Sequence, residues 1–561
     1  MLTIRNPLSK IQQQKNQAVE SNVEAVKAQL KNLNRSEEEL LEICDKSLSE
    51  LQSELQLKKL NPIDLLHAYQ LKALKLKEEQ HCGIGEFIVE AEKQANELKY
   101  LKTGKSDLYG IPISIKELIP VQGHDATYGL LKLCGNREAD DCALIQTLRA
   151  QGAIPFIVTP SSQLALTLSG YNPVYGDMKH PKSDHHLPGG SSTGEAVLLS
   201  NHASPIGIGN DIAGSIRIPC AFCGLAGLKP TTQRLGYQNN RNIFTASVLK
   251  IKSSAGPMGR CVDDLVSVMR TLLQPILFKL APSIPPIPFN EDLYNTSASD
   301  LKIGYYETIE DTNLVQSVPS VRRAVNQAVE ILKHAGCQLI KFDPPEPHTA
   351  MQLGFSALMA DGGEQIRAYL KNEPLNDHTR SLEQFVSVPS MMRGVIDLGI
   401  KRWLGNPAAV MTFVKKLGNL KEVTDVVNRI EDYRFKFEAA MKSCEDLDIL
   451  VCPVWPFPAP TMDTQSHITT PAVIYTLLYN VLDYPAGAVP MGCVSEEDVK
   501  EAEKAAVDLE AQKDHYHVQV MRSQKESKGL PLSVQVVGKP YREELVLRVM
   551  KLIEDAASVV K

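Results

Sequence analysis

Small residues are concentrated in one stretch of this chain, residues 186–230. It reads HLPGGSSTGEAVLLSNHASPIGIGNDIAGSIRIPCAFCGLAGLKP, and Gly190 and Gly214 directly precede Ser191 and Ser215. Glycine permits tight turns and a close approach of the backbone, so backbone N–H groups can face a bound molecule. The stretch therefore predicts a site in which backbone amides lie around two serine hydroxyls.

A lysine upstream of this stretch lies on a predicted strand. Residues 111–117 read IPISIKE, in which Ile111, Ile113 and Ile115 share one strand face while Ser114 and Lys116 share the other. Taken alone, such a lysine indicates an ordinary strand end whose amine reaches solvent. Only its combination with the two serines favours a chemical role.

The segment GGSSTGE is also compatible with a phosphate-binding loop at a helix N-terminus. It lacks the lysine of a nucleotide-binding P-loop, and no acidic residue stands at the distance that a dinucleotide site requires. A nucleotide site is therefore not expected.

Two other kinds of site are disfavoured. His180, His185 and His186 offer a histidine for a Ser-His-Asp triad, but the G-x-S-x-G elbow is missing and KHPKSDHH is typical of an exposed loop. Cys220 and Cys223 form a C-x-x-C with no second pair, so we interpret them as core residues rather than metal ligands.

The composition indicates a folded globular protein, with 561 residues of which 43% are hydrophobic and 22% charged. Asp and Glu number 66 against 60 Lys and Arg, so bulk charge gives no reason to expect nucleic acid as a partner. The eleven cysteines lack the dense spacing of a disulfide-rich secreted fold. The first residues are too polar for a signal peptide, and no run reaches the ~18 apolar residues of a spanning helix. We expect an intracellular protein.

The chain divides into two patterns. The first hundred residues are expected to be mainly helical: Ser36 and Glu39 form a capping box, and Asn61 with Pro62 indicates the start of a further helix. From Leu108 onward, short runs rich in Ile and Val alternate with helical patterns, which is typical of an α/β core. We predict an N-terminal helical region, 1–60, followed by one domain, 61–561.

Three segments resemble successive pieces of the amidase signature: YGIPISIKE, PGGSSTGEA and GNDIAGSIRIPCAFCGLAGLKPT. QGHDATYG, IGYYET, DGGEQ, YNVLDYPAGAVP and GLPLSVQVV further resemble the fatty acid amide hydrolases of animals. The resemblance runs from about Leu51 to Glu554. It implies an amidase signature hydrolase domain over 61–561, with a central twisted mixed β-sheet surrounded by α-helices, and it implies no metal and no cofactor.

The resemblance also assigns roles to residues. It implies Ser215 as the nucleophile, Ser191 as the bridging serine and Lys116 as the terminal base. The oxyanion hole would consist of the backbone N–H groups of Ile212, Ala213, Gly214 and Ser215. The supporting residues would be Asp211, Arg217 and Ser192.

Such a triad has a physical logic of its own. A serine hydroxyl must lose its proton as it attacks, and a lysine can take that proton only when it is neutral. Burial among isoleucines and glycine-rich backbone disfavours the ammonium form and lowers the lysine pKa. We therefore expect an activity that rises toward alkaline pH.

Two positions depart from the pattern of the relatives, because Ala213 and Thr193 stand where glycine is usual. Neither change removes a side chain from the chemistry. Extra bulk beside the predicted oxyanion hole could narrow the site or alter substrate preference.

An apolar and basic segment, residues 386–421, predicts two helical stretches broken at Asn406 and Pro407. Periodicity alone favours core or dimer-contact helices. In fatty acid amide hydrolases the corresponding segment is a membrane-binding cap, and the resemblance implies the same here, with peripheral attachment to one leaflet. The apolar residues assigned to this cap are Met391, Met392, Trp403 and Phe413. The basic residues expected to face anionic head groups are Arg393, Lys401, Arg402, Lys415 and Lys416.

The resemblance implies a serine hydrolase that cleaves fatty acid amides and N-acylethanolamines to free fatty acid plus amine or ammonia. Its partners would be a lipid amide, a membrane surface and a second copy of the chain in a homodimer. The stretch 163–169, QLALTLS, is a candidate pocket wall. Two alternatives stay open: another amidase signature enzyme, such as an amidotransferase subunit, and a non-catalytic protein that binds lipid amides.

Overall fold

One mixed sheet of eleven strands organises the described residues of the computed structural model, which are 8–33, 35–80, 82–100, 106–237, 249–404 and 410–559. In sheet order the strands are β1 (Glu86–Phe87), β3 (Ile154–Thr159), β2 (Pro112–Lys116), β4 (Ile206–Asp211), β6 (Ser254–Gly259), β5 (Ala226–Lys229), β10 (Ala486–Cys493), β11 (Pro531–Gly538), β9 (Ile449–Pro453), β7 (Lys302–Tyr305) and β8 (Gln338–Lys341). Strands β3, β2 and β4 run parallel, as do β9, β7 and β8, and the other neighbours are antiparallel. The predicted α/β class with a mixed sheet is confirmed.

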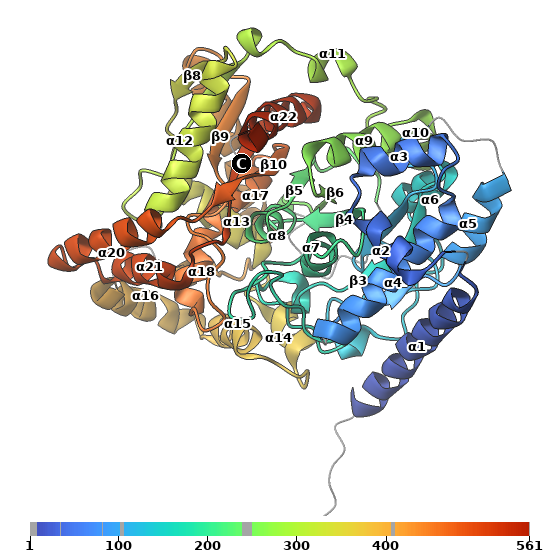
Figure 1. The fold of residues 1–561 in the computed structure, drawn as a ribbon. Coiled ribbons are helices and arrows are strands. Elements are labelled where there is room, and N and C mark those ends of the chain that lie inside the picture. The colour runs from blue at the N-terminus through green and yellow to red at the C-terminus, as the bar shows by residue number, and fades with distance from the viewer. Residues whose placement is uncertain are drawn as a thin grey trace, which may run out of the picture.

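Helices surround this sheet (Figure 1). Taken in chain order, the first group of helices is α1 (Leu8–Gln29), α2 (Glu37–Asp45), α3 (Leu48–Gln56), α4 (Pro62–Gln80) and α5 (Ala91–Tyr100). The second is α6 (Ala143–Ala150), α7 (Thr193–Ser200), α8 (Arg217–Cys223), α9 (Val262–Leu272), α10 (Pro275–Leu280), α11 (Glu291–Tyr294) and α12 (Pro319–His334). The third is α13 (Pro347–Leu358), α14 (Glu364–Leu370), α15 (Asp377–Ser387), α16 (Ser390–Leu404) and α17 (Leu420–Ser443). The last is α18 (Ser466–Ala472), α19 (Ile474–Val481), α20 (Glu496–Ala511), α21 (His515–Arg522) and α22 (Glu543–Val559).

Local signals set several helix starts. Oγ of Ser36 accepts the backbone N–H of Glu39, and the Glu39 carboxylate accepts the backbone N–H of Ser36, so the predicted capping box begins α2. Pro62 is the first residue of α4, where a missing N–H costs nothing. Both predictions are confirmed.

The parallel strands β2 and β4 bring distant residues to one sheet edge. They are direct neighbours, and Lys116 and Asp211 are their last residues. The carboxyl ends of parallel strands lie at the same edge, which is where open α/β sheets form their sites. Helix α7 packs against both strands, and α8 packs against β5, β10 and β11 (Figure 1).

Glycine in β4 permits close packing at this edge. A Cβ at Gly207 would lie 1.8 Å from Oε2 of Glu195, and one at Gly209 would lie 2.9 Å from Oγ of Ser192. The strand therefore has no space for side chains there, and α7 can approach its backbone directly.

Within the parts of the chain that the structure describes, no helix is both long enough and apolar enough to cross a bilayer.

Candidate active site

Lys116 lies at the end of β2 with its side chain fully buried. Its Nζ donates to Oγ of Ser191 at 2.7 Å and to Oγ of Ser192 at 3.0 Å, and lies 3.4 Å from the carbonyl oxygen of Asn210. The structure thus brings the predicted base to the first serine site. The interpretation as an ordinary strand-end lysine that reaches solvent is wrong.

Burial also sets the charge of this lysine. Removal from water lowers the pKa of Lys116 to about 7, although the carboxylates of Asp211, Glu117 and Glu195 act to raise it. The neutral amine is therefore well populated near neutral pH, whereas a solvated lysine is almost entirely protonated there. A neutral amine can accept a proton, as a base must.

The turn before α7 depends on glycine. Gly189 has φ = 81°, a left-handed conformation that favours glycine, and a Cβ at Gly190 would lie 2.1 Å from the carbonyl oxygen of Thr167. Thr193, one of the two departures from the family pattern, is buried and donates from Oγ1 to the carbonyl oxygen of Gly189 at 2.7 Å. Its added side chain therefore stabilises this turn.

Ser215 lies in the loop between β4 and α8. Its carbonyl oxygen accepts the N–H of Ser192 at 3.0 Å, which ties the two serine segments together. The residue is 9% exposed and lines the same cavity as Ser191 and Ala213. Within the described residues, Oγ of Ser215 has no hydrogen-bond partner, so the Ser215–Ser191 link of the predicted relay is open in this structure.

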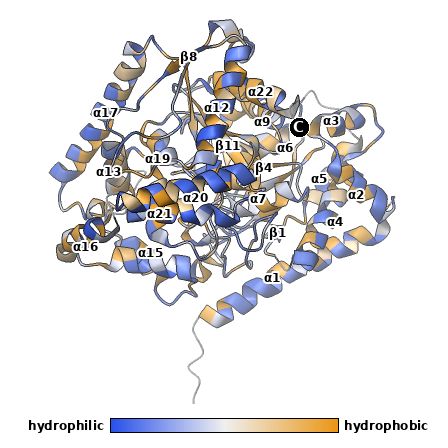
Figure 2. Cartoon of the chain, turned by 60° about the vertical axis from the view of Figure 1, so that its left-hand side comes forward, coloured by the Kyte–Doolittle hydropathy of each residue, from blue (hydrophilic) through white to orange (hydrophobic). Residues whose placement is uncertain are grey.

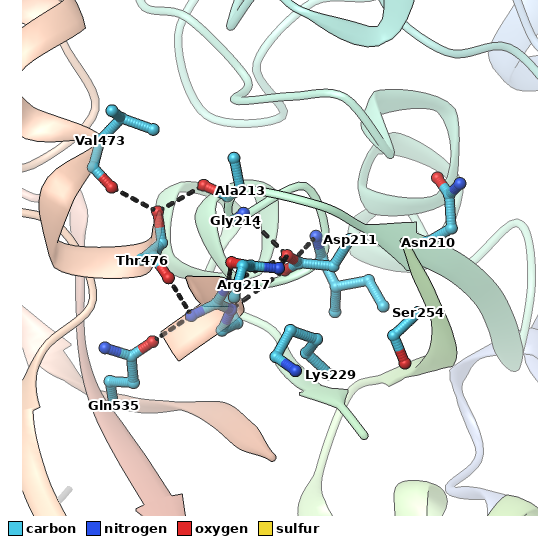
Figure 3. Close-up of polar contacts among 12 residues, drawn as sticks. Asn210, Asp211, Ala213, Gly214, Arg217, Lys229, Ser254, Val473, Thr476 and Gln535 are labelled. Atoms are coloured by element: carbon cyan, nitrogen blue, oxygen red, sulfur yellow. Dashed lines mark hydrogen bonds and ion pairs between the residues drawn. The ribbon is translucent and has the colours of Figure 1, made fainter. Parts of the chain in front are cut away.

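A buried ion pair supports this loop (Figure 3). Arg217 donates from Nε to Oδ2 of Asp211 and from Nη2 to Oδ1, both at 3.0 Å. Asp211 also accepts the backbone N–H groups of Gly214 at 2.8 Å and of Ile216 at 3.1 Å. Burial acts to raise the pKa of Asp211, but the charge and hydrogen bonds of Arg217 hold it well below its usual range. The ionised carboxylate thus fixes the loop on both sides of Ser215.

The contact with Asp211 changes the set of oxyanion donors. Four backbone N–H groups were predicted, but that of Gly214 is already engaged by the Asp211 carboxylate. The candidates that remain are the N–H groups of Ile212, Ala213 and Ser215.

Three supporting residues from the C-terminal half had no predicted role. Oγ1 of Thr476 donates to the carbonyl oxygen of Ala213 at 2.6 Å (Figure 3). The side-chain oxygens of Asn480 and Gln535 accept from Arg217 at 2.6 and 2.7 Å. Asn480 and Gln535 fall in YNVLDYPAGAVP and GLPLSVQVV, two segments that carried the resemblance, and Thr476 lies just before the first of them.

The cavity above the serines is mainly apolar, with a volume of about 190 Å³. Leu187, Ile218, Phe355, Phe385 and Trp455 contribute to its wall. The predicted wall at 163–169 is confirmed in part, because residues 165–168 line the cavity. A small number of polar groups beside a large apolar surface is the usual form of a site for an apolar ligand with one reactive group.

Comparison with known proteins shows the family of this chain. A family model described as amidase matches residues 64–547. The chain belongs to the amidase family. It is 34% identical to fatty-acid amide hydrolase 1 of Sus scrofa, over 90% of this chain and 85% of that protein. It is 32% identical to fatty acid amide hydrolase 1 of Caenorhabditis elegans, over 91% of this chain and 88% of that one. A solved structure of a fatty acid amide hydrolase matches with a TM-score of 0.76 and 25% identity, covering 98% of this chain and 94% of that structure.

Two of the histidines considered for a Ser-His-Asp triad form hydrogen bonds with groups other than Ser191 and Ser215. The ring of His180 hydrogen bonds with the carbonyl oxygen of Phe222, and burial lowers the pKa of His180 to about 4. The ring of His186 bonds with Ser183. Cys220 and Cys223 are buried, as predicted, and within the described ranges no group of three potential ligands could hold a metal ion.

The predicted membrane residues separate into two groups. Met391 and Trp403 on α16 are 85% and 75% exposed, and Met392 is half exposed. Phe413 is only 7% exposed and packs against His348 and Phe355, so its assignment to a membrane-facing surface is wrong. Helix α16 lies at the edge of the amidase (Figure 2). The predicted break at Asn406 and Pro407 lies outside the described residues.

Arg393 also differs from expectation, because it is buried instead of facing solvent. Its guanidinium donates to the carbonyl oxygens of Val388 and Val414. Asp397 on the same helix accepts the backbone N–H groups of Met411 and Thr412 at 3.1 and 2.7 Å. These two charged side chains attach α16 to the segment that follows it, because Arg393 bonds the carbonyl oxygen of Val414 and Asp397 bonds the N–H groups of Met411 and Thr412.

Proposed function

We propose that this amidase hydrolyses long-chain fatty acid amides and N-acylethanolamines to free fatty acid plus amine or ammonia, through an acyl-enzyme on Ser215. The observation that carries the proposal is a buried lysine, with a pKa lowered to about 7 by burial, in contact with Ser191 beneath an apolar cavity that Ser215 also lines.

In the proposed cycle, Ser215 turns toward Ser191 and attacks the substrate carbonyl carbon. The Ser215 proton passes to Ser191, and the Ser191 proton passes to the neutral amine of Lys116. The N–H groups of Ile212, Ala213 and Ser215 stabilise the oxyanion. The relay then returns the proton to the departing amine, and water hydrolyses the ester on Ser215 by the same path.

The lining of the cavity supports a lipid acyl chain as the substrate portion. Aliphatic and aromatic side chains make up most of its wall, and burial of each methylene in such a site contributes about 0.8 kcal/mol. The relatives named as fatty acid amide hydrolases favour the same substrate class.

We also propose that α16 binds a membrane surface peripherally. Five of its apolar side chains, on Met391, Met392, Val395, Leu398 and Trp403, are exposed, and Lys401 and Arg402 lie in its last turn. Exposed apolar residues flanked by basic ones suit an interfacial helix. The intracellular location, the homodimer and the boundary at residue 60 stay predictions.

The proposal is tested by amine release from a series of amides: a long-chain primary amide, an N-acylethanolamine, acetamide and glutamine. We expect turnover of the two lipid amides, little with acetamide or glutamine, and none by Ser215→Ala. Preference for glutamine would favour an amidotransferase role. Undiminished binding of lipid amides by Ser215→Ala, with no turnover by the parent protein, would favour a carrier.

A further inference from the structure

Glu195 is a buried acid whose charge acts on Lys116, and the mechanism above does not use it. Glu195 on α7 is fully buried. Its Oε2 accepts from Oγ of Ser114 at 2.5 Å, and its Oε1 accepts from Oγ1 of Thr159 at 2.6 Å. Ser114 is on β2 and Thr159 ends β3, so this carboxyl joins α7 to the strand that carries Lys116 and to its parallel neighbour.

No cation touches this carboxyl within the described part of the chain. Its Oε2 lies against the backbone of β4, because a Cβ at Gly207 would meet it at 1.8 Å. The titratable groups around it are Lys116 on β2 and Cys220 on α8. The charges of Asp211, at the end of β4, and of Glu117, the next residue, also act on Lys116. Asp211 is already paired with Arg217, and Glu117 is held by Thr127 and Ser161.

Burial shifts the pKa values of Glu195 and Lys116 toward each other. Burial raises the pKa of Glu195 to about 7, although Ser114, Thr159 and Lys116 act to lower it. Burial lowers the pKa of Lys116 to about 7 as well. Two buried groups with such values titrate as a coupled pair, in which the charge of each favours the charged form of the other.

We propose that Glu195 is a positioning residue for Lys116: through Ser114 and Thr159 it holds the strand end that carries the lysine, and its carboxylate stabilises the ammonium that forms when Lys116 takes the proton of Ser191. The inference rests on the proposed function. No proton moves to Glu195 itself, which acts on the amine only through its charge and through the two hydroxyls.

The test is the pH profile of Glu195→Gln, in which the side chain keeps its shape and loses its charge. Without the carboxylate, the ammonium form of Lys116 is less favoured, so the acid limb of kcat should move to lower pH by about 0.5 to 1 unit. Relative to its own plateau, the variant should then be up to roughly three- to tenfold more active than the parent on the part of the acid limb where Glu195 of the parent is ionised. A purely structural role would lower stability and leave the limb in place.

Glu554→Gln is the matched control. Burial raises the pKa of Glu554 to about 7 as well, but it accepts the N–H of Val262 beside Lys551 and does not act on Lys116. Its limb should coincide with that of the parent. If Glu195→Gln does not fold, Thr159→Val removes one donor and keeps both charges, and its limb should move in the same direction by less.

A second readout separates this inference from the proposed function. The rate at which a fluorophosphonate labels Ser215 reports activation of the nucleophile without any lipid substrate. A parent protein that is labelled but cleaves no lipid amide contradicts only the substrate class. If the acid limbs of the pH profiles coincide in parent and variants, both for the labelling of Ser215 and for turnover, the proposed role of Glu195 is overturned.

Discussion

Replacing Arg217 with methionine should destabilise the amidase severely. Methionine keeps much of the length and apolar character of the side chain but removes all five hydrogen bonds of the guanidinium, two of them to Asp211. Asp211 would be left as a fully buried carboxylate with no cation in contact. Breaking a buried ion pair on one side costs about 3–5 kcal/mol, a large share of the 5–15 kcal/mol by which most proteins are stable.

The stability of the parent and that of Arg217→Met should change with pH in opposite directions. In the parent, the pKa of Asp211 lies below its usual range, so the pair contributes stability above about pH 4 that is lost only as pH falls through the lowered value. In Arg217→Met the charge and hydrogen bonds of Arg217 are lost, so burial outweighs the remaining contributions of Lys229 and Asn480 and raises the pKa of Asp211. The variant should therefore lose stability as pH rises above about 4.

Urea unfolding at several pH values measures both the loss of stability and its pH dependence. The unfolding midpoints are converted into free energies of unfolding with the same m-value for parent and variant. Arg217→Met combined with Asp211→Asn should be more stable than Arg217→Met alone by more than about 1 kcal/mol, because the second change removes the unpaired charge. A loss below about 1 kcal/mol in Arg217→Met, or no recovery in the double variant, would refute the reasoning.

Three further predictions follow from the site and from α16. Because the pKa of Lys116 is about 7, kcat should rise as pH increases through 7, and Lys116→Met should lower kcat by at least about a hundredfold at every pH; steady-state rates from pH 5 to 9 test both. Thr476→Val removes the donor to the Ala213 carbonyl oxygen, so kcat should fall roughly tenfold with KM little changed, and an equal rise in KM would contradict a role in the loop. Met391→Ser with Trp403→Ser should weaken sedimentation with anionic vesicles while turnover of a detergent-dispersed amide persists, and unchanged sedimentation would contradict the membrane role of α16.

The grouping of Lys116 with the serine turns could be predicted because its signals are local. The alternation around Lys116 identified a strand, and the glycines before Ser191 and Ser215 identified turns. The physical argument that burial would make the lysine a base needed only its apolar neighbours, and a pKa of about 7 agrees with it. The engagement of the Gly214 N–H by Asp211 could not be foreseen, since it depends on the φ and ψ angles of the turn, which a glycine permits but does not fix.

Contacts over long sequence separations were not predictable. Thr476 reaches Ala213 across 263 residues, and Gln535 reaches Arg217 across 318. The sequence of 386–421 similarly shows which residues are apolar but not what covers them. Phe413 faces Phe355 inside the protein while Trp403 faces outward, and only the packing of α13 against the segment around 411–413 separates the two.

Identification of the acylated residue tests the central claim most directly. The amidase would be mixed with an activated long-chain acyl ester, quenched in acid, weighed intact and digested for peptide mass spectrometry. The account predicts one added acyl group, located on Ser215 and absent from Ser215→Ala. An acyl group on Ser191 or Ser192, or turnover that persists in Ser215→Ala, would contradict it.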